Sequence, residues 1–254
     1  MTRQQTVLCS KCSRPFRPGA RYCSGCGTAA PKEEDPEHSA GKNSLNAMLW
    51  FYGSLLVFIF IIRKIESVQG PEWAFGIDIL FALLVLGFAL KSYRELLPLL
   101  RVKDLEIIKI ISVAITAILF GFLVIQISTW LHQNLFHSGQ YNEMYMFEDS
   151  AFPLLFSILS IAVQPAFFEE LGFRGLIYSH IEKAGGGAAA LLVSSFMFAI
   201  LHLNIISLLW LVPAGLTFGW LRQRYNTIWY GITGHFFYNS TIVVIDFYSR
   251  AHLH

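Results

Sequence analysis

Long apolar runs separated by short polar breaks occupy most of the chain from residue 45 onward. A helix needs about 20 mainly apolar residues to cross a bilayer. Runs of about this length predict seven spans, at about 45–62, 73–90, 107–131, 151–170, 187–203, 206–221 and 227–248. The pattern therefore predicts an all-α polytopic membrane protein with about seven transmembrane helices.

The composition agrees with this fold class. Of the 254 residues, 54% are hydrophobic and only 14% are charged, and the mean hydropathy is +0.50. A soluble domain carries about 25% charged residues. The formal net charge of +2 is too small to favour a nucleic-acid partner. We expect membrane lipid around most of the chain and no bound nucleic acid.

Residues 1–30 predict a small zinc-ribbon module ahead of the spans. All four cysteines of the chain lie here, as two C-x-x-C pairs formed by Cys9, Cys12, Cys23 and Cys26. Four thiolates give Zn²⁺ a closed tetrahedral shell, which is typical of a structural site. Two disulfides are the alternative. A thiolate site implies a reducing compartment, so we expect a cytoplasmic N-terminus and a protein partner, of unknown identity, for the ribbon.

The remaining chain divides by its polar breaks. Residues 31–44 are charged and contain proline and glycine, which predicts a flexible linker. Residues 45–131 are expected to form three accessory spans, and residues 150–248 a four-helix core. Lys and Arg gather after the second and sixth spans, which places those breaks in the cytoplasm of a multi-pass plasma-membrane protein. Arg63, Lys64 and Arg250 run against this orientation.

Polar residues inside the last four predicted spans form three clusters with i, i+4 spacing. They are Glu169-Glu170-x-x-x-Arg174, Phe198-x-x-x-His202 and His235-x-x-x-Asn239. Ionisable groups at membrane depth cost roughly 2.5–3.5 kcal/mol each, so they mark bundle interiors or water pockets. On a helix Glu170 can pair with Arg174. Glu169 points about 100° away from Glu170 and has no such partner on its own helix.

A depth count predicts that the three clusters meet. If the fourth helix continues past Arg174 to about Lys183, and 185–187 form the turn, Glu169 lies roughly 21 Å from that turn. His202 lies roughly 22 Å from the turn on the next helix. The clusters then share one layer, whereas a helix that ends near Arg174 would keep them apart.

Such a layer suits a hydrolase that activates water inside the membrane. Glu169 is the candidate general base, and Asn239 can donate to a developing oxyanion. Pro165, one turn before Glu169, removes an intrahelical hydrogen bond and tends to open the helix to water. Two histidines and a carboxylate, namely Glu169, His202 and His235, are equally suited to hold a catalytic divalent metal.

The three clusters resemble the CAAX-protease and bacteriocin-processing family of intramembrane endopeptidases, whose pattern is E-E-x-x-x-R, then F-x-x-x-H, then H-x-x-x-N or H-x-x-x-D. The resemblance covers about residues 150–245. It implies hydrolysis of a peptide or protein substrate, lipidated in some members, near the membrane. Glu169 would be the base, and Glu170 with Arg174 a structural or substrate-positioning pair. His202, His235 and Asn239 would orient water, bind a metal or stabilise the oxyanion.

Two other functions use the same residues. Intramembrane Glu, Arg and His also mark ion pathways, so a proton- or metal-coupled transporter is one alternative. Flux that depends on Glu169 would favour it, although the seven spans show no internal repeat. A non-catalytic scaffold or immunity protein that acts through the ribbon is the other. It would tolerate loss of Glu169 and fail when Cys9 and Cys12 are replaced.

Overall fold

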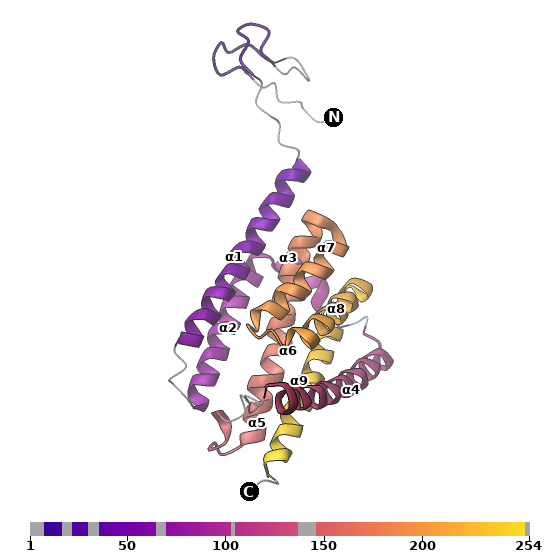
Figure 1. The fold of residues 1–254 in the computed structure, drawn as a ribbon. Coiled ribbons are helices and arrows are strands. Elements are labelled where there is room, and N and C mark those ends of the chain that lie inside the picture. The colour runs from indigo at the N-terminus through magenta and orange to yellow at the C-terminus, as the bar shows by residue number, and fades with distance from the viewer. Residues whose placement is uncertain are drawn as a thin grey trace. The chain divides into compact units, whose positions relative to one another are not determined.

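The computed structural model describes residues 8–16, 22–29, 36–64, 70–102, 105–136 and 146–251. They form two compact units, Met1–Ala40 and Gly41–His254. The first unit contains two isolated β-bridges, Leu8 with Pro15 and Tyr22 with Ala29. The second is built from helices (Figure 1).

The helices follow one another in the order α1 (Pro36–Lys64), α2 (Pro71–Lys91), α3 (Tyr93–Leu96), η1 (Leu97–Leu100), α4 (Ile107–Leu131) and η2 (His132–Phe136). A continuous helical run then comprises α5 (Pro153–Ser157), η4 (Ile158–Val163), α6 (Gln164–Glu170), η5 (Leu171–Ile177) and α7 (Tyr178–Leu201). The chain ends with α8 (Leu208–Tyr225) and α9 (Trp229–Ala251). The segments η2, η4 and η5 are π-helical, and η1 is a 3₁₀ turn.

The fourth helix runs past Arg174, as the depth count requires, and the glycines make the turn. Gly186 has φ 80° and ψ 172°, a conformation that side chains with a Cβ rarely adopt, and it divides α7 into two arms. After this kink the chain returns beside η5, where Phe173 and Phe198 stack edge to face at 5.3 Å (Figure 1). Counting the two arms separately, the described part of the chain has seven long helices, and their number agrees roughly with the seven predicted spans.

The charged linker differs from the expectation. Helix α1 begins at Pro36 and includes residues 36–44, which the sequence predicts to be flexible. Proline is well suited to the first position of a helix, because its φ is preset and its missing N–H has no partner there. The rest of the predicted linker, residues 31–35, lies outside the described part of the chain.

Within the described residues, four segments are long and apolar enough to cross a membrane. They are Gly41–Lys64, Pro71–Lys91, Ile107–Leu135 and Pro153–Leu201. The last has 49 residues and contains both arms around the kink, so it covers two of the predicted spans. The chain is therefore an all-α membrane protein with an N-terminal four-cysteine unit.

The most enclosed part of the helical unit surrounds η5. Every residue from 170 to 181 is buried. A Cβ at Gly172 would lie 3.1 Å from the ring of Phe51 on α1, and one at Gly175 would lie 3.0 Å from Leu96 on α3. These close approaches surround the segment with other helices, so its charged side chains are removed from lipid.

Two contacts fix the place of α9. Its first turn is held by η1, because the carbonyl of Leu99 accepts from Ile228 N and the carbonyl of Leu100 accepts from Trp229 Nε1 at 2.9 Å. Farther along, α9 packs on α4 (Figure 1), where a Cβ at Gly121 would lie 3.2 Å from the carbonyl oxygen of Tyr238. Contacts with η1 and α4 thus set the position of α9, the helix that carries His235.

Candidate active site and cysteine cluster

Glu170 and Arg174 form a fully buried ion pair on consecutive turns of the α6–η5 run. Arg174 Nη1 donates to Oε1 of Glu170 at 2.7 Å, and both side chains have an exposed fraction of 0%. Arg174 Nη2 donates to the carbonyl of Gly215 on α8 at 3.1 Å. Its guanidinium also lies over the ring of Phe198, 4.5 Å from the centroid. The pair therefore joins three helices at their common core.

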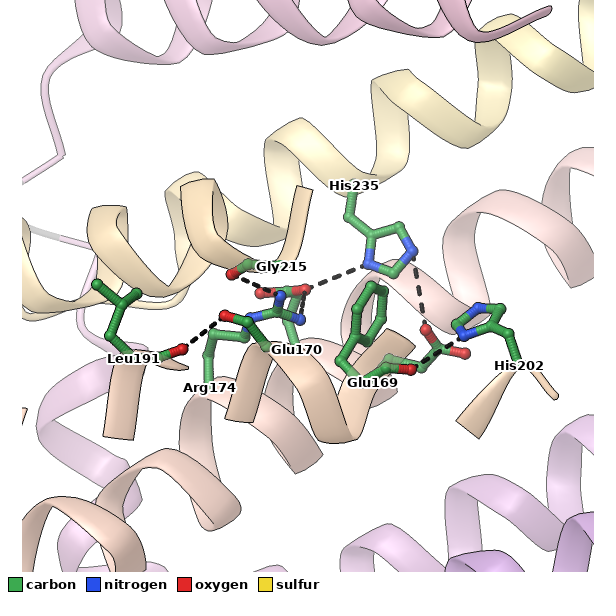
Figure 2. Close-up of polar contacts among 9 residues, drawn as sticks. Glu169, Glu170, Arg174, Leu191, His202, Gly215 and His235 are labelled. Atoms are coloured by element: carbon green, nitrogen blue, oxygen red, sulfur yellow. Dashed lines mark hydrogen bonds and ion pairs between the residues drawn. The ribbon is translucent and has the colours of Figure 1, made fainter. Parts of the chain in front are cut away.

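His235 of α9 lies between the two adjacent glutamates (Figure 2). Its Nδ1 is 3.3 Å from Oε1 of Glu170, and its Nε2 is 3.8 Å from Oε2 of Glu169. His235 is 4% exposed, and its ring stacks on that of Phe218 with the centroids 5.7 Å apart. A carboxylate at Nδ1 favours the tautomer with the proton on that nitrogen. In a neutral ring Nε2 is then an acceptor that faces Glu169.

Glu169 differs from its neighbour in access and in partners. Its side chain is 18% exposed, whereas that of Glu170 is fully buried. No described residue donates a hydrogen bond to Oε2 of Glu169, and 3.8 Å to His235 is too long for a direct one. Contacts of this length between polar groups are commonly bridged by water. Oε2 of Glu169 is itself buried, so of the two glutamates Glu169 is the one whose side chain, but not this oxygen, reaches the surface.

His202 directly follows the last residue of α7, and its ring lies beside that of Phe198. Its Nδ1 lies 3.1 Å from the carbonyl of Phe198, to which an Nδ1–H would donate. The Phe198 ring contacts the rings of both His202 and His235, at 5.1 and 5.8 Å. In Figure 2 the His202 ring and the Glu169 carboxylate point toward one another. Arg63 Nη2 donates to the His202 carbonyl at 3.3 Å, which joins α1 to this corner.

Asn239 lies on α9 one turn beyond His235, and its amide has a different partner. Asn239 Nδ2 donates to the carbonyl of Ile161 in η4 at 2.8 Å. The structure therefore brings Glu169, Glu170, Arg174 and His235 together and joins His202 to them through Phe198. In this structure the Asn239 amide nitrogen is used in the contact with η4.

Small residues let the charged pair be enclosed. A Cβ at Gly231 would lie 2.5 Å from Oε2 of Glu170, and one at Gly215 would lie 3.0 Å from Ser195. The spacing Gly215-x-x-x-Gly219 is typical of a close contact between membrane helices. Neither Phe218 nor Gly231 is predicted from the sequence. Gly231 lies one turn before His235 on α9, whereas Phe218 lies on α8, which carries none of the three clusters.

The four cysteines form two similar knuckles. The amide of Ser13 donates to the carbonyl of Cys9 at 2.8 Å, and that of Gly27 donates to Cys23 at 2.9 Å. Ser13 and Gly27, one after each C-x-x-C pair, both have positive φ. The chain therefore turns in the same way twice and directs both thiol pairs to one centre.

The thiol geometry is that of a metal site. All four Sγ atoms lie within 4.8 Å of one another, and all four cysteines are free thiols. The Sγ atoms of Cys9 and Cys26 are 3.5 Å apart, as are those of Cys12 and Cys23. A tetrahedron with Zn–S bonds of 2.3 Å has edges of about 3.8 Å. The donor set therefore fits a metal ion, and the two-disulfide alternative is not what the structure contains.

Backbone amides favour the thiolate at Cys9 and Cys23, whereas at Cys12 the Arg14 amide is outweighed by the neighbouring thiols of Cys23 and Cys26, which raise the pKa to about 12. The amides of Lys11 and Cys12 lower the pKa of the Cys9 thiol to about 6. The amide of Gly25, whose nitrogen lies 3.4 Å from Sγ of Cys23, lowers the pKa of that thiol too. Thiolates are the form that binds metal.

The possible metal ligands inside the predicted membrane region, Glu169, His202 and His235, are not gathered around one point as the four thiols are. Among the described residues, the only group of three or more metal-ligating side chains with ligand atoms within 4.8 Å is the cysteine cluster. Glu169, His202 and His235 do not form such a group, so their side chains would have to move to hold a metal together.

Comparisons with known proteins match this region. Residues 151–241 match the family model described as Type II CAAX prenyl endopeptidase Rce1-like, a range that contains all six intramembrane candidates. Two proteins of Bacillus subtilis (strain 168) are similar in sequence. "Uncharacterized protein YpbD" is 29% identical over 62% of this chain and 79% of its own length. "Putative membrane peptidase YdiL" is 25% identical over 87% of this chain and 78% of its own length.

No solved structure matches the chain. The family model ends two residues after Asn239 and begins close to the start of α5, so it covers the helices that build the candidate active site. Residues 151–241 are therefore similar to the Type II CAAX prenyl endopeptidase Rce1-like family over the helices that carry the three polar clusters.

Proposed function

We propose that the chain is an intramembrane endopeptidase that hydrolyses a peptide bond near the membrane with water activated by Glu169. One observation carries the proposal, namely that two adjacent glutamates differ in burial and in their ion-pair partners. Glu170 is fully buried in an ion pair with Arg174. The Glu169 side chain is partly exposed, and its Oε2, which no described residue hydrogen-bonds, faces His235 Nε2 at 3.8 Å. The Rce1-like family and the name of the relative YdiL support the same reaction class.

Glu169 transfers one proton twice in this mechanism. Its carboxylate takes a proton from a bound water as the water oxygen attacks the scissile carbonyl carbon. The tetrahedral intermediate then collapses, the C–N bond breaks, and the same proton passes to the leaving nitrogen. The products are a carboxylic acid and an amine, and Glu169 returns to its starting state.

The two imidazoles orient the water and stabilise the oxyanion. Each has its Nδ1 directed to a fixed acceptor, Glu170 for His235 and the Phe198 carbonyl for His202. Each therefore has Nε2 available for the reacting groups, as an acceptor when neutral and a donor when protonated. The oxyanion contact predicted for Asn239 would have to use the rest of its amide, because Nδ2 already donates to Ile161.

We propose a metal ion for the cysteine unit and a reaction without a metal for the helical unit. We assign zinc to Cys9, Cys12, Cys23 and Cys26, where a closed shell of four thiolates stabilises the fold and takes no part in hydrolysis. No step of the proposed reaction passes through a metal at Glu169, His202 or His235, because their ligand atoms are not gathered for one. The cysteine unit is proposed to lie in the cytoplasm, with the helices in the plasma membrane.

A comparison of membrane peptides can identify the substrate. Membranes that contain the parent chain are compared by peptidomics with membranes that contain Glu169→Gln, and Glu72→Gln, an exposed carboxylate of α2, is the matched control. We expect uncleaved precursors to accumulate only with Glu169→Gln. Purified parent enzyme should cleave them at least about 100-fold faster than the variant. Equal cleavage by the two proteins would sink the proposal.

The same experiment shows whether the substrate carries a lipid. The precursors that accumulate are analysed by mass spectrometry with and without their lipid modification. A set confined to lipidated chains would place this enzyme with prenyl-peptide substrates, and an unmodified set would assign it another class of membrane peptide.

A further inference from the structure

The second arm of α7, residues 187–201, and α8 form an antiparallel hairpin. Three glycines bring the two helices close together along their length, since a Cβ on each would lie 2.5–3.0 Å from a side chain of the facing helix. The glycines and the residues that face them are Gly187 with Gln223, Gly219 with Leu191 and Gly215 with Ser195. This order places the turn, residues 202–207, at one end of the hairpin and Gly187 with Gln223 at the other.

The hairpin is too short to cross a bilayer twice. Residues 187–201 rise about 22 Å along the helix axis, and residues 208–221 of α8, which precede Arg222, rise about 21 Å. The hydrocarbon core of a bilayer is about 30 Å thick. The helical run before the kink, residues 153–185, is about twice as long as either arm and is ample for one crossing. Apolar helices as short as the two arms are typical of re-entrant or buried segments.

The turn at the tip of the hairpin is apolar. No Asp, Glu, Lys or Arg occurs between Lys183 and Arg222, so the uncharged stretch continues through the turn. The side chain of Ile205 is 86% exposed and that of Leu203 is 51% exposed. Large apolar side chains that no protein group covers are favourable in hydrocarbon and unfavourable in water. The composition of the turn therefore fits a position inside the membrane.

Side chains act as hydrogen-bond partners for the backbone of this turn. Asn204 Oδ1 accepts from the amides of Ile206 and Ser207, at 3.0 and 3.2 Å. Ser207 Oγ donates to the carbonyl of Asn204 at 2.7 Å. The carbonyl of His202 accepts from Arg63 Nη2 at 3.3 Å. Hydrocarbon offers no partners, so irregular backbone at membrane depth depends on contacts of this kind.

We propose that residues 187–221 form a re-entrant hairpin, which enters and leaves the membrane on the same face and keeps its tip inside the bilayer. Asn204 is then a positioning residue, because it fixes the turn directly after His202 and so holds that imidazole toward Glu169. One hairpin that does not cross replaces two of the predicted crossings. The topology is independent of the proposed function, whereas the effect of Asn204 on catalysis rests on it.

Thiol labelling from each face of the membrane tests the topology. The full chain carries one of the replacements Ile205→Cys, Asp149→Cys and Arg224→Cys, all at exposed positions. A membrane-impermeant maleimide is added to intact cells or to inverted vesicles, and mass spectrometry of the peptides separates each new thiol from the four native ones. Asp149 and Arg224 are the matched controls, because they lie near opposite ends of the crossing made by residues 153–185.

We expect the two control thiols to react from opposite faces. Ile205→Cys should react at least about tenfold more slowly than either control from both faces, since apolar surroundings disfavour the thiolate. The protein does not cover this position, and after denaturation in SDS all three thiols should react alike. Reaction of Ile205→Cys as fast as either control would overturn the re-entrant hairpin. If that variant is not produced, Leu209→Cys, at a position that is 66% exposed, replaces it.

Substitutions at Asn204 test its positioning role. Asn204→Ser keeps a neutral acceptor, whereas Asn204→Asp keeps an acceptor and adds a charge. In water Asp is as good a helix cap as Asn, but a carboxylate at membrane depth is costly. We therefore expect Asn204→Ser to stay within about 2 °C of the parent Tm, and Asn204→Asp and Asn204→Ala to lower Tm by about 3–8 °C. Asn134→Asp, at an exposed position in η2, is the control for the added charge and should change Tm little.

With an identified precursor, Asn204→Ala should lower kcat by about tenfold or more at nearly constant KM, and Asn204→Ser should restore most of it. Equal Tm values for Asn204→Asp and Asn204→Ser would place the turn in water and contradict its proposed depth. A kcat of Asn204→Ala equal to that of the parent would overturn the positioning role. If the parent cleaves nothing, the proposed function fails, and the labelling still decides the topology.

Discussion

Glu169 and Glu170 are adjacent in sequence and end in different surroundings. Glu170 points into the core, where Arg174 and His235 share its Oε1. Glu169 points about one hundred degrees away, as any helix dictates for neighbours, and keeps a side chain that is 18% exposed. The same residue type therefore holds the site at one position and is available for chemistry at the next.

The Glu170–Arg174 pair should be far more sensitive to loss of one partner than to loss of both. Removing one member of a buried pair leaves an uncompensated charge and costs about 3–5 kcal/mol. We expect Glu170→Gln and Arg174→Met each to lower the free energy of unfolding by this order, measured by denaturation in mixed micelles.

The double variant should recover much of that loss, because two apolar or neutral side chains can share a core. Glu169→Gln is the matched control for the single variants, since the Glu169 side chain is partly exposed and makes no ion pair as short as that of Glu170 with Arg174. Additive losses in the double variant would show that the two side chains do not act as a pair.

At the scale of helices, close approaches explain why polar groups can be enclosed. Gly172 lies against α1, Gly215 against α7 and Gly231 against the Glu170 carboxylate. Helix α1 also reaches the site, through Arg63 and the His202 carbonyl. This contact gives a structural role to a basic residue that runs against the charge distribution expected for its side of the membrane.

Gly231→Ala should disturb the site by steric overlap. Its Cβ would lie 2.5 Å from Oε2 of the buried Glu170 carboxylate, so either that carboxylate or α9 must move. Overpacking of this kind costs about 1–3 kcal/mol. We expect a lower Tm of the purified chain and weaker Glu169-dependent cleavage.

Gly53→Ala on α1 is the matched control, because nothing lies within 4 Å of its Cβ position. Alanine is favoured over glycine inside a helix by about 0.5–1 kcal/mol, so this variant should be as stable as the parent or more so. A Gly231→Ala protein as stable as the control would mean that the carboxylate is not confined as described.

At the scale of the molecule, the chain divides into two compact units, Met1–Ala40 with the four cysteines and Gly41–His254 with the candidate active site. Replacement of Cys9 and Cys12 by serine should remove about one equivalent of bound zinc, measured by elemental analysis of the purified chain. The Tm of the helical unit and Glu169-dependent cleavage should stay unchanged. Zinc that persists in this variant and disappears in His202→Ala would instead locate a metal in the membrane cluster.

The polar clusters were readable from sequence because membrane depth makes such residues rare. Their i, i+4 spacing and the family pattern pointed to Glu169, Glu170, Arg174, His202 and His235. Phe218 and Gly231 could not be found in this way, since apolar and small residues are common in every span. The partner of Asn239 was equally hidden, because Ile161 is 78 residues away and contributes only a backbone oxygen.

The sequence by itself determined the helical membrane fold, the four-thiol cluster and the residue types of the candidate site. It did so because hydrophobic length, cysteine spacing and the cost of buried charge are local properties of a chain. Tertiary structure decided which carboxylate is sealed, which way each imidazole faces and what the Asn239 amide binds. These depend on which helices touch and in what register, and packing across distant segments sets that register.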